Sequence, residues 1–218
     1  MIGGVLARAN RPPSGPRRPA AASAIVRDAE AWCGGRSWAW RAILLLYFAW
    51  AGWRQIRDPF AWSLFAGVNL GVHELGHVLF AFAGRFVGVA GGSLAQVAAP
   101  AAAGALLWRQ RDFFGLSVAG AWEAFSIWNL ATYVGDARSR ELPLLGLTAE
   151  PIHDWNYLLS RLGLLAWDRG LAGVLRLAAF LLWAASLLWG AWLCRTMARR
   201  GRKPPLENPP GQRFRPGE

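Results

Sequence analysis

Cysteine, histidine and charged side chains are scarce in this sequence of 218 residues. Its two cysteines, Cys33 and Cys194, stand far apart, so the chain encodes neither a disulfide framework nor a C-x-x-C metal site. Charged residues make up 17% of the chain, well below the ~25% of soluble domains. These shortages argue against a soluble protein, and they leave histidines and carboxylates as the available metal ligands.

Long apolar runs separate the few charged residues. They predict an all-α, polytopic transmembrane helical bundle of about six membrane segments, because a helix needs about 20 apolar residues to cross a lipid bilayer. The predicted segments are residues 38–53, 60–84, 86–108, 113–134, 152–167 and 171–194. The run 152–167 is short for a crossing, so it is the least secure member of this set.

The run 86–108 contains several residues that weaken helices. Gly91, Gly92, Gln96 and Pro100 all lie in its first two-thirds. This composition predicts a broken helix or a re-entrant loop, which a membrane tolerates where protein buries it or where it lines a cavity. A continuous helix whose glycines permit close packing is the alternative interpretation.

The net charge of +11 comes almost wholly from arginine. The arginines gather beside apolar runs, as the positive-inside rule predicts, so topology explains the charge and nucleic acid is not an expected partner. Residues 1–35 and 197–218 are predicted to be disordered basic tails, the first with a short interfacial helix at 29–35, around a transmembrane domain of residues 36–196. Basic residues at both ends predict cytoplasmic termini and an even number of crossings. We expect an integral protein of a bacterial inner (plasma) membrane.

The stretch His73-Glu74-Leu75-Gly76-His77 lies inside the second apolar run and has the pattern H-E-x-x-H. Residues four apart share one face of a helix, so His73 and His77 can hold a single ion. Glu74 lies about 100° from His73 around the helix, where it can reach a water on the ion without binding the ion. Three ionisable residues in one turn of an apolar helix are costly to insert, which favours a Zn²⁺ site over a chance pattern.

A catalytic zinc needs a third protein ligand. The only other histidine, His153, precedes Asp154 at the start of a later apolar segment. Neighbouring side chains diverge by about 100° on a helix, so one of the two is predicted to be the ligand and the other a supporting or substrate-facing group. A helix N-cap is the competing role for this pair. Glu123 is the rival third ligand, or else a buried carboxylate that supports a ligand histidine.

Polar residues of the run 113–134 share an arc of about 120° on a helix. They include Glu123 and Asn129, and they predict that this helix turns a polar face to the bundle interior, where water reaches the ion. The candidate substrate-binding or supporting residues are Gln96, Glu123, Asn129 and Asn156.

An apolar helix with His-Glu-Leu-Gly-His, a Gly-rich interruption after it and a downstream Asp following a Pro resembles the site-2 protease-like (M50-like) intramembrane zinc metallopeptidases. The resemblance covers roughly residues 60–165. It implies zinc held by the two motif histidines and Asp154, with Glu74 as the general base. It also implies a membrane-embedded Gly-rich segment near the site, for which residues 91–96 are the candidate, and an Asn near the substrate.

The expected function is hydrolysis of a peptide bond in a membrane-protein or membrane-proximal substrate, with water activated by zinc and with no organic cofactor. The alternative is a metal-binding, non-proteolytic membrane protein with an assembly or binding role. The intact Glu74 disfavours that alternative, because a purely structural site needs no base. A transporter with a His/Glu relay is a third class, and the absence of a visible internal repeat disfavours it.

Overall fold

The computed structural model describes residues 21–143 and 152–201, and every regular element within these ranges is a helix. The α-helices are α1 (Ala21–Trp32), α2 (Ala39–Arg57), α3 (Ala66–Phe80), α4 (Arg85–Arg109), α5 (Phe113–Gly135), α6 (Asp154–Arg161) and α7 (Asp168–Arg200), and the 3₁₀ turns are η1 (Ala81–Ala83) and η2 (Leu165–Trp167). The all-α prediction is confirmed for these residues. The bundle of about six spans is not confirmed.

Two stretches are long and apolar enough to cross a membrane, judged by length and composition. They are Arg85–Arg109, with a mean hydropathy of 1.4, and Leu165–Arg200, with a mean hydropathy of 2.0. The predicted segment 60–84 contains only the 15 residues of α3 and the short turn η1. At ~1.5 Å per residue α3 is about 22 Å long, shorter than the ~30 Å hydrocarbon core. The run 152–167 likewise holds only the short α6 and η2.

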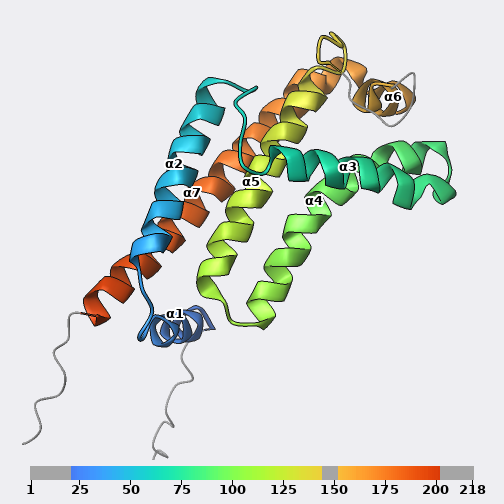
Figure 1. The fold of residues 1–218 in the computed structure, drawn as a ribbon. Helices are drawn as coiled ribbons and strands as arrows, with labels where there is room; N and C mark the ends of the chain where they lie inside the picture. Colours follow the sequence, from blue (N-terminus) through green and yellow to red (C-terminus); the bar gives the residue numbers. More distant parts are fainter. Residues whose placement is uncertain (1–20, 144–151, 202–218) are drawn as a thin grey trace, which may run out of the picture.

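Helix α5 is the centre of the bundle. Figure 1 shows α2 and α7 on one side of it and α4 on the other, while α3 lies at a steep angle to α2 and α5. Ala121, Ala124 and Ala131 on α5 are fully buried, so its small side chains let the neighbouring helices approach closely. Phe48 from α2 and Leu193 from α7 belong to the same buried core.

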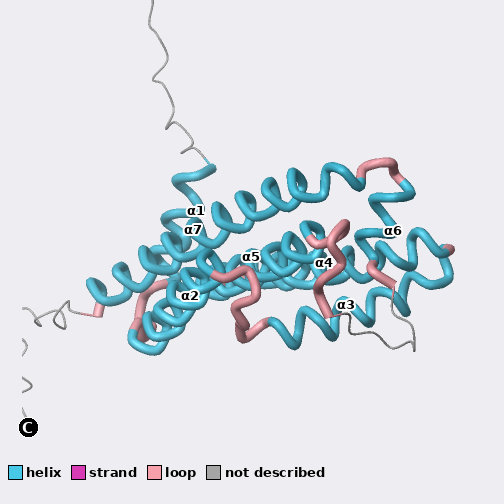
Figure 2. Tube along the Cα trace, turned by 90° about the horizontal axis from the view of Figure 1, so that it is seen from above, coloured by secondary structure: helices cyan, strands magenta, loops and turns pink. Residues whose placement is uncertain are grey.

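Helix α1 lies at the end of the bundle where α7 also ends, as Figures 1 and 2 show. The Cys33 thiol, just after α1, donates to the Leu193 carbonyl at 3.7 Å, and Arg200 pairs with Glu30 at 3.8 Å. The prediction of a disordered tail is therefore wrong for residues 21–28, because α7 provides a surface on which they fold, while the helix predicted at 29–35 is present at residues 29–32. The rest of the predicted tails, residues 1–20 and 202–218, lies outside the described residues.

Helix α4 is continuous, so the predicted broken or re-entrant segment is wrong. Pro100 has no N–H and leaves the carbonyl of Gln96, four residues earlier, without its helical donor. The Ser126 hydroxyl on α5 donates to that carbonyl at 2.9 Å. A neighbouring helix thus satisfies the group that proline leaves unpaired, and α4 continues through it.

The glycines of α4 serve its contact with α3. A Cβ on Gly76 of α3 would lie 2.3 Å from the carbonyl oxygen of Gly91, and a Cβ on Gly91 would lie 2.7 Å from the carbonyl oxygen of Gly76. Backbones can meet this closely only where neither residue carries a side chain. Because Gly91 is helical, its backbone groups are engaged in the hydrogen bonds of α4.

Gly52 lies where α2 meets α7. A Cβ there would be 2.2 Å from Nε1 of Trp183, whose indole N–H donates to the Phe48 carbonyl at 2.9 Å. We expect Gly52→Ala to displace the indole and to lower the free energy of unfolding by about 1–3 kcal/mol, as overpacking does. Thermal unfolding in detergent measures this. Gly173→Ala on α7 is the control, since no atom lies within 4 Å of its added Cβ; equal unfolding temperatures for the two variants would contradict the packing.

Candidate metal centre

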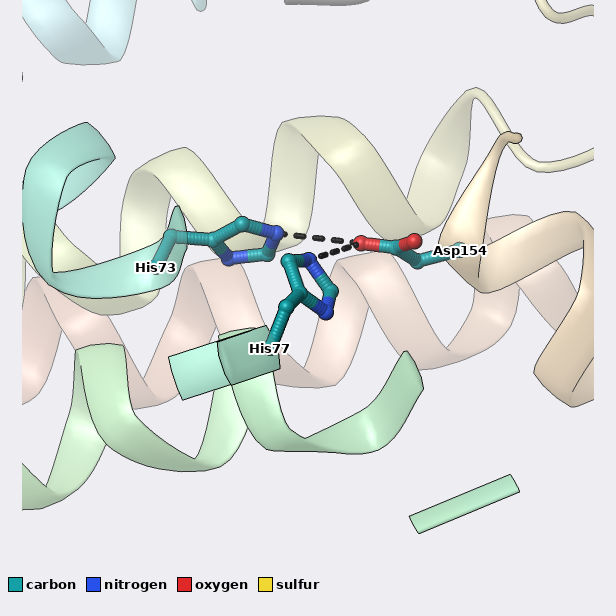
Figure 3. A group of neighbouring side chains, drawn as sticks. All are labelled: His73, His77 and Asp154. Atoms are coloured by element: carbon teal, nitrogen blue, oxygen red, sulfur yellow. Dashed lines mark hydrogen bonds and ion pairs between the residues drawn. The ribbon is translucent and has the colours of Figure 1, made fainter. Parts of the chain in front are cut away.

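Three side chains from two helices converge on one point (Figure 3). His73 and His77 project from α3, and Asp154 is the first residue of α6. Nε2 of His73 lies 3.0 Å from Oδ2 of Asp154, and Nε2 of His77 lies 3.1 Å from the same oxygen. These separations are close to the ~3.3 Å expected between ligands of a tetrahedral ion with bonds of ~2.0–2.1 Å. Residues 81 positions apart in sequence therefore form one possible ligand set.

The second nitrogen of each imidazole has its own partner. Nδ1 of His77 lies 3.0 Å from the carbonyl oxygen of Gly88, which can only accept, so Nδ1 carries the proton. Nδ1 of His73 lies 3.1 Å from Oε1 of Gln96, whose amide nitrogen donates to the Ser126 carbonyl at 3.1 Å. That second bond fixes Oε1 as the acceptor, so His73 also donates through Nδ1. When both imidazoles are neutral, each therefore turns an unprotonated Nε2 toward Asp154.

With these hydrogen-bond partners, three atoms that carry lone pairs face one another: Nε2 of His73, Nε2 of His77 and Oδ2 of Asp154. Two unprotonated imidazole nitrogens and a carboxylate oxygen repel at about 3 Å unless a proton or a cation lies between them. His73 and Asp154 are also buried, so water screens the repulsion poorly. A metal ion satisfies all three groups at once. Two imidazoles and one carboxylate are a ligand set of catalytic zinc sites, and the residues present therefore fit that ion.

Helix α4 leaves the space that an ion needs. A Cβ on Gly92 would lie 2.6 Å from Nε2 of His77 and 2.7 Å from Nε2 of His73. Any larger residue at this position would occupy the volume in front of the two ligand nitrogens. The close contact between Gly76 and Gly91 brings Gly92 beneath the histidines.

The N-terminus of α6 decides which of the two neighbours reaches the histidines. His153 is the N-cap of this helix: its Nδ1 accepts a hydrogen bond from the backbone N–H of Asn156 at 3.2 Å. Its Nε2 then carries the proton and donates to Oδ2 of Asp136 at 3.1 Å. Both nitrogens of His153 are therefore engaged away from the histidine pair. The structure brings Asp154 to the motif, and the capping role falls to His153.

Asp136, at the end of α5, anchors this arrangement. Its carboxylate accepts hydrogen bonds from the Ser139 hydroxyl, from His153 and from the backbone N–H groups of Glu141 and Leu142. Burial raises the pKa of the Asp136 carboxyl, but these hydrogen bonds outweigh burial and hold its pKa below the ordinary value. A lowered pKa in the folded state contributes stability above about pH 4, and that stability is lost as the pH falls through the lowered value.

Glu74 shares a cleft with the three possible ligands. The cleft has a volume of about 780 Å³ and is lined by residues of α3, α4, α5 and the start of α6. The side chain of Glu74 is half-buried, and its carboxylate is not one of the clustered ligand atoms. This carboxylate is therefore available for proton transfer inside the cleft rather than for coordination.

The four predicted supporting residues separate into two groups. Gln96 and Asn129 line the cleft, and Gln96 contacts His73 directly. Glu123 is not among the residues that line the cleft, and its buried Oε2 has no hydrogen-bond partner among the described residues. Asn156 lines a second, neighbouring cavity. Glu123 and Asn156 are thus not brought to the ligand cluster.

Two residues of the site were not predicted. The hydroxyl of Tyr133 accepts a hydrogen bond from the backbone N–H of Asp154 at 3.0 Å, and its place on the polar arc of α5 was the available signal. Asn69 lies four residues before His73, so it continues the same helix face. Its amide donates to Oδ1 of Asn129 at 2.9 Å and its oxygen accepts from the Trp122 indole at 2.8 Å, which holds both amides at the cleft.

Gln96 orients His73, and its loss has a specific expected effect. We expect Gln96→Leu to weaken zinc binding about 10–100-fold, as the removal of a hydrogen-bond partner of a ligand histidine does. Gln55→Leu is the matched control: Gln55 is also buried and also donates to a backbone carbonyl, that of Pro59 at 2.9 Å, but it lies on α2. Competition against a metal-sensing dye measures both affinities. Equal affinities for the two variants would remove Gln96 from this role.

Comparison of the chain with protein-family models, with curated proteins and with solved structures finds no match.

Proposed function

We propose that this chain is an intramembrane zinc metallopeptidase of the site-2 protease-like (M50-like) kind. The observation that carries the proposal is the convergence of Nε2 of His73 and Nε2 of His77 on one oxygen of Asp154, at 3.0 and 3.1 Å. Glu74 lines the same cleft and takes no part in that cluster. A cation-binding triad beside a separate carboxylate is the minimum that metal-assisted hydrolysis requires.

Each residue of the cleft has a role in this chemistry. Zinc held by the triad would polarise the substrate carbonyl and lower the pKa of a water to about 7. Glu74 accepts the proton of the attacking water and returns it to the leaving amine. Gln96 and the Gly88 carbonyl hold the two imidazoles in the tautomer that leaves Nε2 free. Asn129, whose oxygen is held by Asn69, offers its N–H groups to a substrate carbonyl.

The proposal places this site in a lipid bilayer. Large apolar side chains face outward on both flanks of the bundle: Ile43 and Leu46 on α2 are each 69% exposed, and Leu188 on α7 is 73% exposed. Exposed apolar surface of this extent suits lipid rather than water. The substrate is then a membrane protein or a membrane-proximal peptide, which must present an extended segment because a helix hides its carbonyls.

Four crossings, by α2, α4, α5 and α7, give the topology that we propose. Helix α3 enters the bilayer at an angle and carries the motif to its interior. An even number of crossings keeps α1 and the end of α7 on one face, in accord with their position at one end of the bundle (Figure 1). The arginine-rich sequence at both termini favours the cytoplasmic side for that face, and we propose a bacterial inner membrane as its location.

Metal removal and return tests the proposal. The full chain, purified in detergent, is given a quenched fluorescent peptide of apolar sequence. We expect hydrolysis to cease after dialysis against a chelator and to return with Zn²⁺ but not with Mg²⁺, because imidazole ligands suit zinc while Mg²⁺ prefers oxygen. Hydrolysis that survives complete metal removal would contradict the proposal. A chain that binds zinc and cleaves none of a broad peptide set would instead be a metal-binding, non-proteolytic protein.

A further inference from the structure

A second cavity, of about 760 Å³, adjoins the cleft of the metal centre. Arg85 and Ile152 line both cavities, so the two are neighbours. The residues that line the second cavity come from the start of α4, the turn after α5 and the segment 152–161 around α6, and three of them are arginines: Arg85, Arg140 and Arg161. A bound peptide that extends from the metal centre past Arg85 would therefore meet a strongly basic pocket.

The three arginines have no acidic partner within residues 21–143 and 152–201. No carboxylate of these ranges lies within ion-pair distance of Arg85, Arg140 or Arg161. Arg138, two residues before Arg140, shows the contrast: it contacts both oxygens of Asp168 at 2.8–2.9 Å. The charge of these three pocket arginines is therefore not neutralised by a carboxylate of the described residues. Asp136, four residues before Arg140, is a buried carboxylate that already accepts four hydrogen bonds.

Two of the guanidinium groups are held against one ring. The carbon Cζ of Arg85 lies 5.2 Å, and that of Arg161 5.7 Å, from the centroid of Tyr157. Cation–π contacts of this kind restrict long side chains without neutralising their charge. The ring therefore holds two guanidinium groups in the second cavity, and one of them, that of Arg85, also lines the cleft of the metal centre.

Arg140 is held there by an unusual backbone. Its φ is 52°, in the left-handed region that non-glycine residues rarely adopt. The conformation is maintained by the hydrogen bond from its backbone N–H to the Asp136 carbonyl at 2.8 Å. Strained conformations persist where the surroundings impose them, and they gather at ligand sites. Here the strain presents a third arginine to the pocket.

We propose that this arginine pocket binds a carboxylate side chain of the peptide substrate, so that the chain selects substrates with an acidic residue close to the scissile bond. Guanidinium groups bind carboxylates through paired hydrogen bonds. The inference rests on the proposed function and names its substrate class. The shared lining by Arg85 and Ile152 favours a group carried on the substrate over a separate ligand.

The position of the acidic residue follows from the spacing. The carbonyl of Gly88 contacts His77, and Arg85 begins α4 three residues earlier, about 4.5 Å along the helix. An extended peptide advances about 3.3 Å per residue. The acidic residue is therefore expected within about three residues of the scissile bond, on the side that runs toward Arg85.

Paired peptides test the inference. An apolar fluorogenic peptide carries Asp or Asn at each position near the scissile bond, and the full chain in detergent cleaves each pair. We expect kcat/KM to be about tenfold higher for Asp than for Asn at one position, and the ratio to fall to about one in the variant with Arg85, Arg140 and Arg161 all changed to Ala. Arg161→Glu is expected to reverse the preference toward a Lys peptide. Arg54→Ala is the control, because Arg54 stacks on Trp50 outside the pocket.

Binding gives a readout that does not depend on turnover. Fluorescence anisotropy of the same Asp and Asn peptides on the Glu74→Gln variant should show the same ratio, again lost with the three arginines. An Asp-to-Asn ratio of one in the unaltered chain, or a ratio that persists when all three arginines are changed, would overturn the inference. Hydrolysis of neutral peptides in the same experiment would leave the proposed function intact. Equal stimulation of all peptides by phosphatidylglycerol vesicles over phosphatidylcholine, lost in the triple variant, would assign the pocket to a lipid phosphate and would also overturn it.

Discussion

Glu74→Gln is expected to keep its zinc and to lose hydrolysis. The amide has nearly the same shape as the carboxylate, but it cannot accept a proton from water at neutral pH. Removal of a general base costs typically 10²–10⁴-fold in rate, and we expect kcat to fall by about that factor. Glu74 is not one of the possible metal ligands, which are His73, His77 and Asp154, so the zinc content should be unchanged.

Glu123→Gln is the matched control for this experiment. Glu123 is a half-buried carboxylate on α5 that does not line the cleft, so its kcat should stay close to that of the unaltered chain. Peptide cleavage and metal content are measured on the same preparations. If Glu74→Gln cleaves at the rate of the unaltered chain, Glu74 is not the base and the proposed mechanism is wrong.

Gly92→Ala is expected to abolish zinc binding without unfolding the protein. The added methyl group would lie 2.6–2.7 Å from the ligand nitrogens of His73 and His77, closer than real Cβ contacts come. The histidines must then turn away, and we expect zinc affinity to fall at least about 100-fold, the upper end of the effect of disturbing ligand orientation. Helix content by circular dichroism should stay unchanged, because alanine favours helix over glycine.

Gly104→Ala on the same helix separates the metal site from general packing. Its added Cβ would lie 3.7 Å from the Cβ of Ala119, which is an ordinary van der Waals contact. Zinc affinity of this variant should equal that of the unaltered chain. Two glycine variants with the same zinc affinity would show that the space above Gly92 is not where the ion binds.

The part of the site that sequence predicts well depends on local geometry. His73 and His77 lie one helical turn apart, so any helix brings them together, and α3 does so. The choice between His153 and Asp154 depends on tertiary contacts instead. His153 turns away because Asp136, 17 residues earlier, accepts its proton and because its other nitrogen caps α6. No spacing rule within α6 contains that information.

The differences between the predicted and the observed helices have a similar origin. The helix breakers in α4 predict an interruption, but Ser126 of α5 satisfies the carbonyl that Pro100 leaves free. The apolar run 60–84 predicts one span, yet its first residues are held in a turn. Asp58 accepts from the backbone N–H of Phe60 at 2.9 Å, and the Tyr47 hydroxyl accepts from that of Leu64 at 2.7 Å. Hydropathy does not register such side-chain contacts, which shorten the helix.

Zinc stoichiometry across a small set of variants tests the central claim most directly. The full chain is purified with excess Zn²⁺ removed, and bound metal is measured by atomic emission. We predict about one zinc per chain in the unaltered protein and in Glu123→Ala, and almost none in His73→Ala, His77→Ala and Asp154→Ala, because two remaining ligands do not hold a catalytic zinc. Equal zinc content in the unaltered protein and in His77→Ala would contradict the account.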